Sequence, residues 1–125
     1  MSLSIAIKDS ATPTVSLGGR LDTDTAPELD EALQQILVRK GIARVVFDVR
    51  ALDYVSSAGI RCFIRTRKAI EPDGGKVIIL HPQPGVRKVL EIVKAIPPGG
   101  IFASTAELDA YLDDIQKQVR EEQKT

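Results

Sequence analysis

The stretch 45–60 constrains the fold of this chain more than any other part of the sequence. It opens with the apolar run Val45–Phe47, which is typical of a buried strand, and passes through a short polar loop into a helix. That helix opens on two adjacent serines, Ser56 and Ser57. The first N–H groups of a helix lack partners inside it, and the helix dipole is positive there. The two hydroxyls therefore suit either a helix cap or a covalently attached phosphate.

A second apolar run, Val77–Leu80, has the same β-branched composition. The intervening helix is predicted over 57–70, because Pro72 and the pair Gly74–Gly75 come directly after it. We expect the two glycines to form a turn. Two buried strands joined by a helix indicate a parallel pair, with both faces of the sheet covered at these strands.

The N-terminal part of the chain predicts an antiparallel strand pair followed by a helix. Apolar residues alternate with polar or small ones over 3–8 and again over 14–17, after which Gly18–Gly19 is expected to form a turn. Thr25 and Glu28 then have the spacing of a capping box. The apolar positions of the helix that follows are Leu29, Ala32, Leu33, Ile36 and Leu37.

The C-terminal part predicts two more helices. One has an apolar stripe over 86–93, and the other has a stripe over 108–119 and begins with capping-box spacing between Ser104 and Glu107. Between them, the segment 99–102 is expected to form a short strand or a loop. The chain is thus predicted to be one α/β domain over 1–119, with a small mixed sheet of four to five strands, about four helices, and a frayed polar tail over 120–125.

Composition excludes several classes of function. Seventeen basic residues balance seventeen acidic ones and aromatic residues make up 4% of the chain, so we expect no nucleic-acid partner. The lone Cys62 and lone His81 leave no set of metal ligands, and no glycine-rich phosphate loop is present, so no metal or cofactor is predicted. The sequence has neither a membrane-length apolar run nor a signal peptide, which predicts a protein of the cytoplasm without a membrane partner.

A serine nucleophile needs a base, and His81 is the one histidine available to Ser57. It follows a strand, so it could reach the same sheet edge. The serine is not set in a Gly-x-Ser-x-Gly elbow, however, and no acid–His–Ser pattern accompanies it. We therefore expect that the protein is not an enzyme. The alternative is a hydrolase that uses Ser57 and His81.

The two serines have two interpretations, a helix cap or a phosphorylation site. A helix cap needs one hydroxyl, and the second serine is followed by the small residues Ala58 and Gly59, which would leave the helix start open to another macromolecule. Phosphorylating Ser57 would add roughly −1.5 to −2 charges there and oppose an acidic or tightly packed partner.

Charged residues nearby also have two interpretations. Asp22 and Asp24 precede a helix, where they would favour its dipole or form part of a site. Arg61, Arg65 and Lys68 share a helix face, which is either solvated or in contact with a partner.

Three segments together resemble the STAS domain, in particular the bacterial anti-sigma factor antagonists: Gly19–Leu29, Val46–Val49 and Asp53–Ile60. The resemblance covers the chain as far as Leu112 and implies the STAS fold, with helices packed mainly on one side of the sheet. It also implies a function. The unphosphorylated protein would bind an anti-sigma factor that is also a serine kinase, and so release a sigma factor.

The resemblance further implies that Ser57, or less readily Ser56, is phosphorylated, and that a PP2C-type phosphatase reverses this. Ser56 falls where many members have an aspartate, and Ala58 where many have a second serine or threonine. The expected partner surface consists of Asp22, Thr23, Thr25, Ser56, Ser57, Ala58, Gly59 and Arg61, with Asp48 and Asp53 as weaker candidates. The expected protein is a monomer or weak dimer; the alternative is a scaffold subunit of a stress-signalling or lipid-transport complex.

Overall fold

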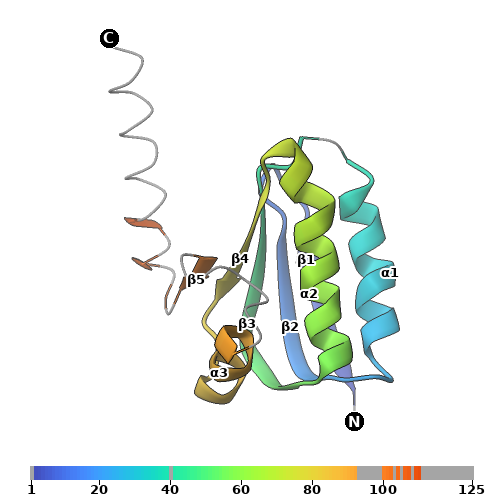
Figure 1. Cartoon of the computed structure of the whole chain (residues 1–125), viewed down its shortest axis with the longest axis vertical. Helices are drawn as coiled ribbons and strands as arrows, with labels where there is room; N and C mark the ends of the chain where they lie inside the picture. The colour runs from blue at the N-terminus through green and yellow to red at the C-terminus, as the bar shows by residue number, and fades with distance from the viewer. Residues whose placement is uncertain are drawn as a thin grey trace.

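The computed structural model describes residues 2–39, 41–92, 100–102, 104, 106, 107, 109 and 110. Five strands form one sheet whose spatial order is the order of the chain (Figure 1). They are β1 (Leu3–Lys8), β2 (Thr14–Leu21), β3 (Arg44–Val55), β4 (Lys76–Leu80) and β5 (Ile101–Phe102). β1 pairs antiparallel with β2, and every later pair is parallel. The predicted mixed sheet, with its antiparallel pair first, is confirmed.

The α-helices with described bounds are α1 (Ala26–Leu37), α2 (Ser57–Ile70) and α3 (Pro84–Ile92). A short 3₁₀ helix, Glu71–Asp73, follows α2. α1 and α2 lie side by side on one face of the sheet (Figure 1), and α3 adds Val86 and Leu90 to the same buried cluster. Packing on one side is confirmed. The stripe over 108–119 and the tail over 120–125 lie almost entirely outside the described residues.

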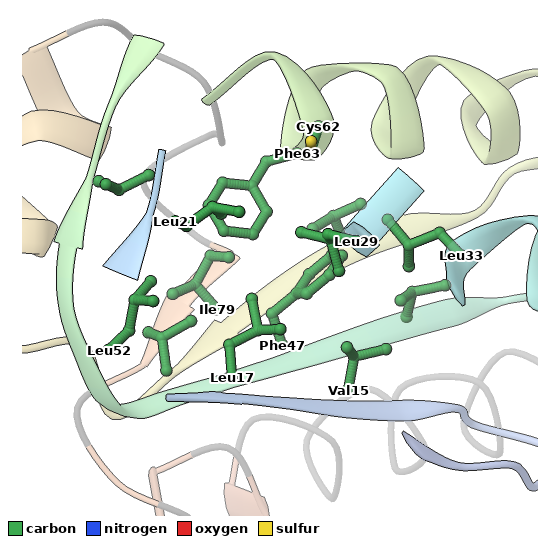
Figure 2. Close-up of a cluster of buried hydrophobic side chains, with 14 of the residues drawn as sticks. Val15, Leu17, Leu21, Leu29, Leu33, Phe47, Leu52, Cys62, Phe63 and Ile79 are labelled. Atoms are coloured by element: carbon green, nitrogen blue, oxygen red, sulfur yellow. The ribbon is translucent and has the colours of Figure 1, made fainter. Parts of the chain in front are cut away.

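The core lies between the sheet and these helices (Figure 2). Phe47 of β3 meets Phe63 of α2 edge to face, with ring centroids 4.9 Å apart, in the arrangement that aromatic pairs prefer. On the opposite face, β3, β4 and β5 form a smaller buried cluster of Val46, Ile78, Leu80 and Phe102. The continuous apolar runs of β3 and β4 are therefore buried on both faces, as predicted.

β3 is longer than the sequence predicted. The polar stretch after Phe47 is not a loop, because the strand continues to Val55. On the face that the helices cover, buried residues follow each other at steps of two, at Val45, Phe47 and Val49, and then at steps of three, at Leu52 and Val55. The register with β2 shifts at the same places, so β3 contains two bulges, each with one extra residue. The bulges break the alternation that would have identified a strand.

Gly18 and Gly19 lie inside β2 and not in a turn. A Cβ on Gly18 would stand 2.6 Å from Ser4 Oγ and 3.2 Å from the Ala51 Cβ, so a side chain there would force the Ser4 side chain to move. Gly19 has φ of +88°, beside the second bulge. The predicted turn at Gly74 is confirmed, with φ of +80° and its N–H donated to the Glu71 carbonyl at 2.8 Å.

The two predicted capping boxes have different outcomes. The one at Thr25 and Glu28 is wrong, because the Thr25 side chain makes no capping hydrogen bond and turns back toward the preceding residues. At Ser104, the hydroxyl accepts the Glu107 N–H at 3.2 Å, as a capping serine does.

Candidate functional site

The starts of α1 and α2 lie at the same end of the sheet (Figure 1). β2 leads into α1 and β3 leads into α2, and these strands run parallel with Leu21 opposite Val55. The Ser56 N–H donates to the Leu21 carbonyl at 2.8 Å. The two helix starts, where the sequence placed nearly all of its candidate residues, are therefore joined by backbone contacts.

Ser56 and Ser57 have separate roles at the start of α2. Ser56 is the N-cap residue: its backbone is extended and its Oγ accepts the Gly59 N–H at 3.4 Å. It is half-buried. Ser57 is exposed, and within the described residues its hydroxyl makes no hydrogen bond. The cap is thus supplied by the first serine, and the second hydroxyl faces solvent.

The start of α1 is closed by internal hydrogen bonds. Thr25 is 5% exposed, and its hydroxyl accepts the Asp22 N–H and donates to the Arg20 carbonyl, both at 2.9 Å. The Ala26 N–H donates to the Asp22 carbonyl at 2.8 Å. Thr23 and Asp24 are exposed at the tip of this loop. Thr25 therefore fixes the loop, whereas Thr23 and Asp24 form its surface.

Asp22 is held by the same loop. Its Oδ1 accepts the N–H groups of Asp24 and Thr25 at 3.0 and 3.1 Å, and its Oδ2 lies 3.7 Å from Arg20 Nε. Partial burial alone would raise the pKa of the Asp22 carboxyl, but these hydrogen bonds and the Arg20 charge outweigh it and lower the pKa. Asp22 therefore carries a negative charge beside the two helix starts.

Packing inside the molecule accounts for the glycine at position 59. Ala58 is half-buried and packs against the core, and Gly59 is buried. A Cβ on Gly59 would stand 2.6 Å from Leu21 Cγ and 2.9 Å from Val55 Cγ2. The glycine lets the first turn of α2 approach the ends of β2 and β3, so access for another macromolecule is not needed to explain it.

Arg20 and Tyr54 complete the site and were missed from the sequence. The Arg20 guanidinium lies over the Tyr54 ring, 4.1 Å from its centroid, and the two residues are paired across β2 and β3. A signal was present: Arg20 and Asp22 alternate with the buried Leu21 and so share one face. The sequence pattern does not indicate Tyr54, because the polar stretch before the serines predicts a loop.

The remaining charged candidates lie along α2 and β3. Arg61, Arg65 and Lys68 are exposed on α2, and Arg65 pairs with Asp30 of α1 at 2.6 Å. Asp48 Oδ1 accepts the Arg50 N–H at 3.1 Å within the first bulge, and Asp53 Oδ1 lies 3.4 Å from the Gln83 side-chain nitrogen. The latter two aspartates thus take part in the hydrogen bonding of β3.

Within the described residues, no hydrogen bond joins His81 to the Ser57 hydroxyl. The last β3 residue paired with β4 is Asp48, opposite Leu80, and β3 runs on to Val55 before the serines. His81 follows Leu80, where its N–H donates to the Phe102 carbonyl at 2.9 Å. The histidine and the serine therefore do not form the pair that a serine hydrolase needs.

Other chemistry finds little support in the described part of the chain. Burial, followed by the nearby Asp30 carboxylate, raises the pKa of the Cys62 thiol to about 12. The described residues include no group of three or more potential metal ligands. None of the described helices is long and apolar enough to cross a membrane.

Comparison with known proteins identifies the family. The family model of the STAS domain matches residues 3–108. The chain belongs to the STAS family. This STAS domain is 37% identical over 76 residues to BtrV of Bordetella bronchiseptica, which is assigned as an anti-sigma factor antagonist. The match takes in 61% of the chain and 65% of BtrV, so the chain spans just under two thirds of that relative's length.

Two further relatives extend the comparison. The anti-sigma-B factor antagonist of Staphylococcus aureus is 30% identical over 78 residues, which cover 62% of this chain and 71% of the relative. The antagonist SpoIIAA of Bacillus has the same fold. Its unphosphorylated form matches with a TM-score of 0.74 and 18% identity, covering 89% of this chain and 97% of SpoIIAA. Its phosphorylated form matches with a TM-score of 0.68 and 17% identity, covering 89% and 99%.

Proposed function

We propose that this STAS domain is an anti-sigma factor antagonist that is switched by phosphorylation of Ser57. The unphosphorylated form binds an anti-sigma factor that is also a serine kinase, and binding frees the sigma factor. The observation that carries the proposal is the division between the serines: Ser56 caps α2, while the Ser57 hydroxyl is exposed and makes no hydrogen bond within the described residues. The names of the relatives support the same function.

The division also favours Ser57 over Ser56 as the acceptor. Phosphorylating Ser56 would turn the Oγ that caps the Gly59 N–H into a phosphoester oxygen and place the phosphate on a half-buried side chain. Ser57 can react without breaking an internal contact. Its Oγ attacks the γ-phosphorus of ATP bound to the partner kinase, the bond to the β–γ bridging oxygen breaks, and ADP and a proton are released. The catalytic groups are the partner's, so this chain needs no active site and acts as a substrate.

The effect of the phosphate follows from its surroundings. It adds roughly −1.5 to −2 charges at a helix N-terminus, where the dipole tolerates them. The nearby Asp22 loop already presents the carboxylates of Asp22 and Asp24. A partner surface that fits the unmodified site would then meet added charge and bulk. A PP2C-type phosphatase would restore binding, and all of these steps would take place in the cytoplasm, with residues 1–119 acting as one domain.

The partner surface in this proposal consists of exposed atoms. Thr23, Ser57 and Arg61 are exposed, and Asp22, Ser56 and Ala58 are half-buried beside them. Thr25 and Gly59 are buried, so they hold the surface in shape from below. In the alternative role, as a scaffold subunit, the protein would bind its partner through the same surface without phosphorylation of Ser57.

The test uses purified protein and the anti-sigma factor kinases of its host, each assayed with ATP. Mass spectrometry should place one phosphate on Ser57 and none on Ser56, and Ser57→Ala should abolish it. Ser57→Asp should weaken kinase binding at least tenfold relative to Ser57→Ala. Ser10→Asp is the matched control, since Ser10 is an exposed serine between β1 and β2, at the other end of the sheet. Equal binding by Ser57→Ala and Ser57→Asp would overturn the proposal, and a stable large assembly without phosphate would favour a scaffold.

A further inference from the structure

The Arg20–Tyr54 pair is an ordered surface feature that the proposed switch does not use. The Arg20 guanidinium lies 4.1 Å from the centroid of the Tyr54 ring, and its Nε lies 3.7 Å from Asp22 Oδ2. One face of the guanidinium is thus covered by the ring and one edge is directed toward a carboxylate. A side chain held at two sides loses little conformational freedom when it binds a partner.

The other edge of the guanidinium is available. Within the described residues, the terminal nitrogens of Arg20 make no hydrogen bond, and the side chain is 36% exposed. Tyr54 is 41% exposed. The described residues contain two other exposed large apolar side chains, Val38 and Ile92, and Val38 follows the end of α1 that is remote from this site (Figure 1).

The pair is continuous with the proposed partner surface. Arg20 contacts Asp22 directly, and Tyr54 precedes the capping Ser56 by two residues on the strand that leads into α2. The Leu21 carbonyl, which follows Arg20, accepts the Ser56 N–H. A partner that covers the Asp22 loop therefore lies next to this pair.

We propose that Arg20 and Tyr54 form a docking point for an acidic side chain of the partner, and that this contact helps to select which partner binds. The inference rests on the proposed function, because it assigns one contact within the same interface. The free edge of a guanidinium matches the two oxygens of a carboxylate, and a stacked aromatic ring fixes the plane in which they meet. Arginine and tyrosine are also the residue types most enriched among the contacts that dominate binding.

The experiment measures the dissociation constant of the purified anti-sigma factor kinase by calorimetry for wild type and four variants. Arg20→Ala should weaken binding at least tenfold and reduce its dependence on salt, since a charge pair is lost. Arg20→Lys should lose most of the same affinity, because an ammonium cannot bind a carboxylate through two parallel hydrogen bonds. Tyr54→Ala should weaken binding several-fold, whereas Tyr54→Phe, which keeps the ring, should bind within twofold of wild type.

Arg50→Ala is the matched control. Arg50 is an exposed arginine on β3, 3.8 Å from a carboxylate oxygen of Asp48, but it lies in the first bulge and away from the serines. It should bind as wild type does. A double-mutant cycle then identifies the occupant: one Asp→Asn or Glu→Gln variant of the kinase should weaken binding alone but not further in combination with Arg20→Ala.

The outcomes separate the two proposals. If Arg20→Ala binds as Arg50→Ala does while Ser57→Asp fails to bind, the docking point is wrong and the switch stands. The docking point is also wrong if no acidic residue of the kinase couples to Arg20. If Ser57→Asp binds like wild type, the proposed function itself fails. Arg20→Lys keeps the charge and the aliphatic stem, so its loss of affinity at unchanged thermal stability cannot be attributed to misfolding.

Discussion

The starts of α1 and α2 both carry hydroxyl residues, but the two sites use these residues differently. Each follows a parallel strand and presents hydroxyl groups. At the start of α1, the Thr25 hydroxyl and the Asp22 carboxylate are both occupied by hydrogen bonds within the loop. At the start of α2, Ser56 meets the structural need with one bond, and the Ser57 hydroxyl is left over. A loop closed by internal hydrogen bonds therefore stands beside an exposed hydroxyl, the arrangement that the proposed switch requires.

The largest loss of stability should come from removing the Thr25 hydroxyl at the start of α1. Thr25→Val keeps the shape of the side chain but leaves the Asp22 N–H and the Arg20 carbonyl without their partner. An unpaired buried group costs about 1–3 kcal/mol, and both of these groups are partly buried, so the free energy of unfolding should fall by about 2–3 kcal/mol in urea denaturation. Thr23→Val, at the exposed tip, should change it by less than about 0.5 kcal/mol. Similar losses of stability for the two variants would mean that the Thr25 hydroxyl does not hold the loop in place.

The next largest loss of stability should come from adding a side chain at Gly59, in the first turn of α2. Gly59→Ala places a Cβ 2.6 Å from Leu21 Cγ. Overpacking costs about 1–3 kcal/mol and outweighs the gain of up to about 1 kcal/mol from higher helix propensity. We expect a net loss of about 1–2 kcal/mol in the free energy of unfolding. Gly85→Ala in α3, where nothing lies within 4 Å of the new Cβ, should be neutral or slightly stabilising. Equal results at both glycines would contradict the close packing.

A smaller effect should divide the two serines. Ser56→Ala removes the helix cap and should lower the free energy of unfolding by about 1 kcal/mol. Ser57→Ala removes a hydroxyl that makes no hydrogen bond within the described residues and should change it by less than about 0.5 kcal/mol. Thermal or urea unfolding measures both. The reverse order would assign the cap to Ser57 and leave Ser56 as the free acceptor.

The smallest effect should appear in the dependence of stability on pH. The folded pKa of Asp22 is below its usual value of 3.8, so its ionised form stabilises the fold. That contribution is complete at neutral pH and is lost as the pH falls from near 4 through the folded pKa. Asp22→Asn should flatten this part of the profile, measured as urea unfolding between pH 6 and pH 3. Asp24→Asn is the control, because it removes the same charge from the same loop while the Asp24 carboxylate accepts no hydrogen bond within the described residues.

Much of the fold could be predicted because local pattern and tertiary structure agree over most of the chain. Continuous apolar runs predicted β4 and the first part of β3, and helical spacing predicted α1, α2 and α3. Prediction failed from Val49 to Val55, where two bulges shift the alternation between inward and outward residues. It failed for Gly18 and Gly19 for the same reason, since these glycines lie opposite the bulged segment of β3.

By itself, the sequence determined which residue types gather at the site: serines at one helix start, and an aspartate and a threonine at the other. Only the tertiary structure decided their roles. Ser56 and Ser57 are chemically identical, and the backbone direction at the end of β3 decides which one caps the helix and which one faces solvent. Likewise, the contact between Arg20 and Tyr54 depends on the register of β2 and β3, which is set by bulges that no local pattern records. Side-chain chemistry is local, but exposure and partnership depend on segments that only the folded sheet brings together.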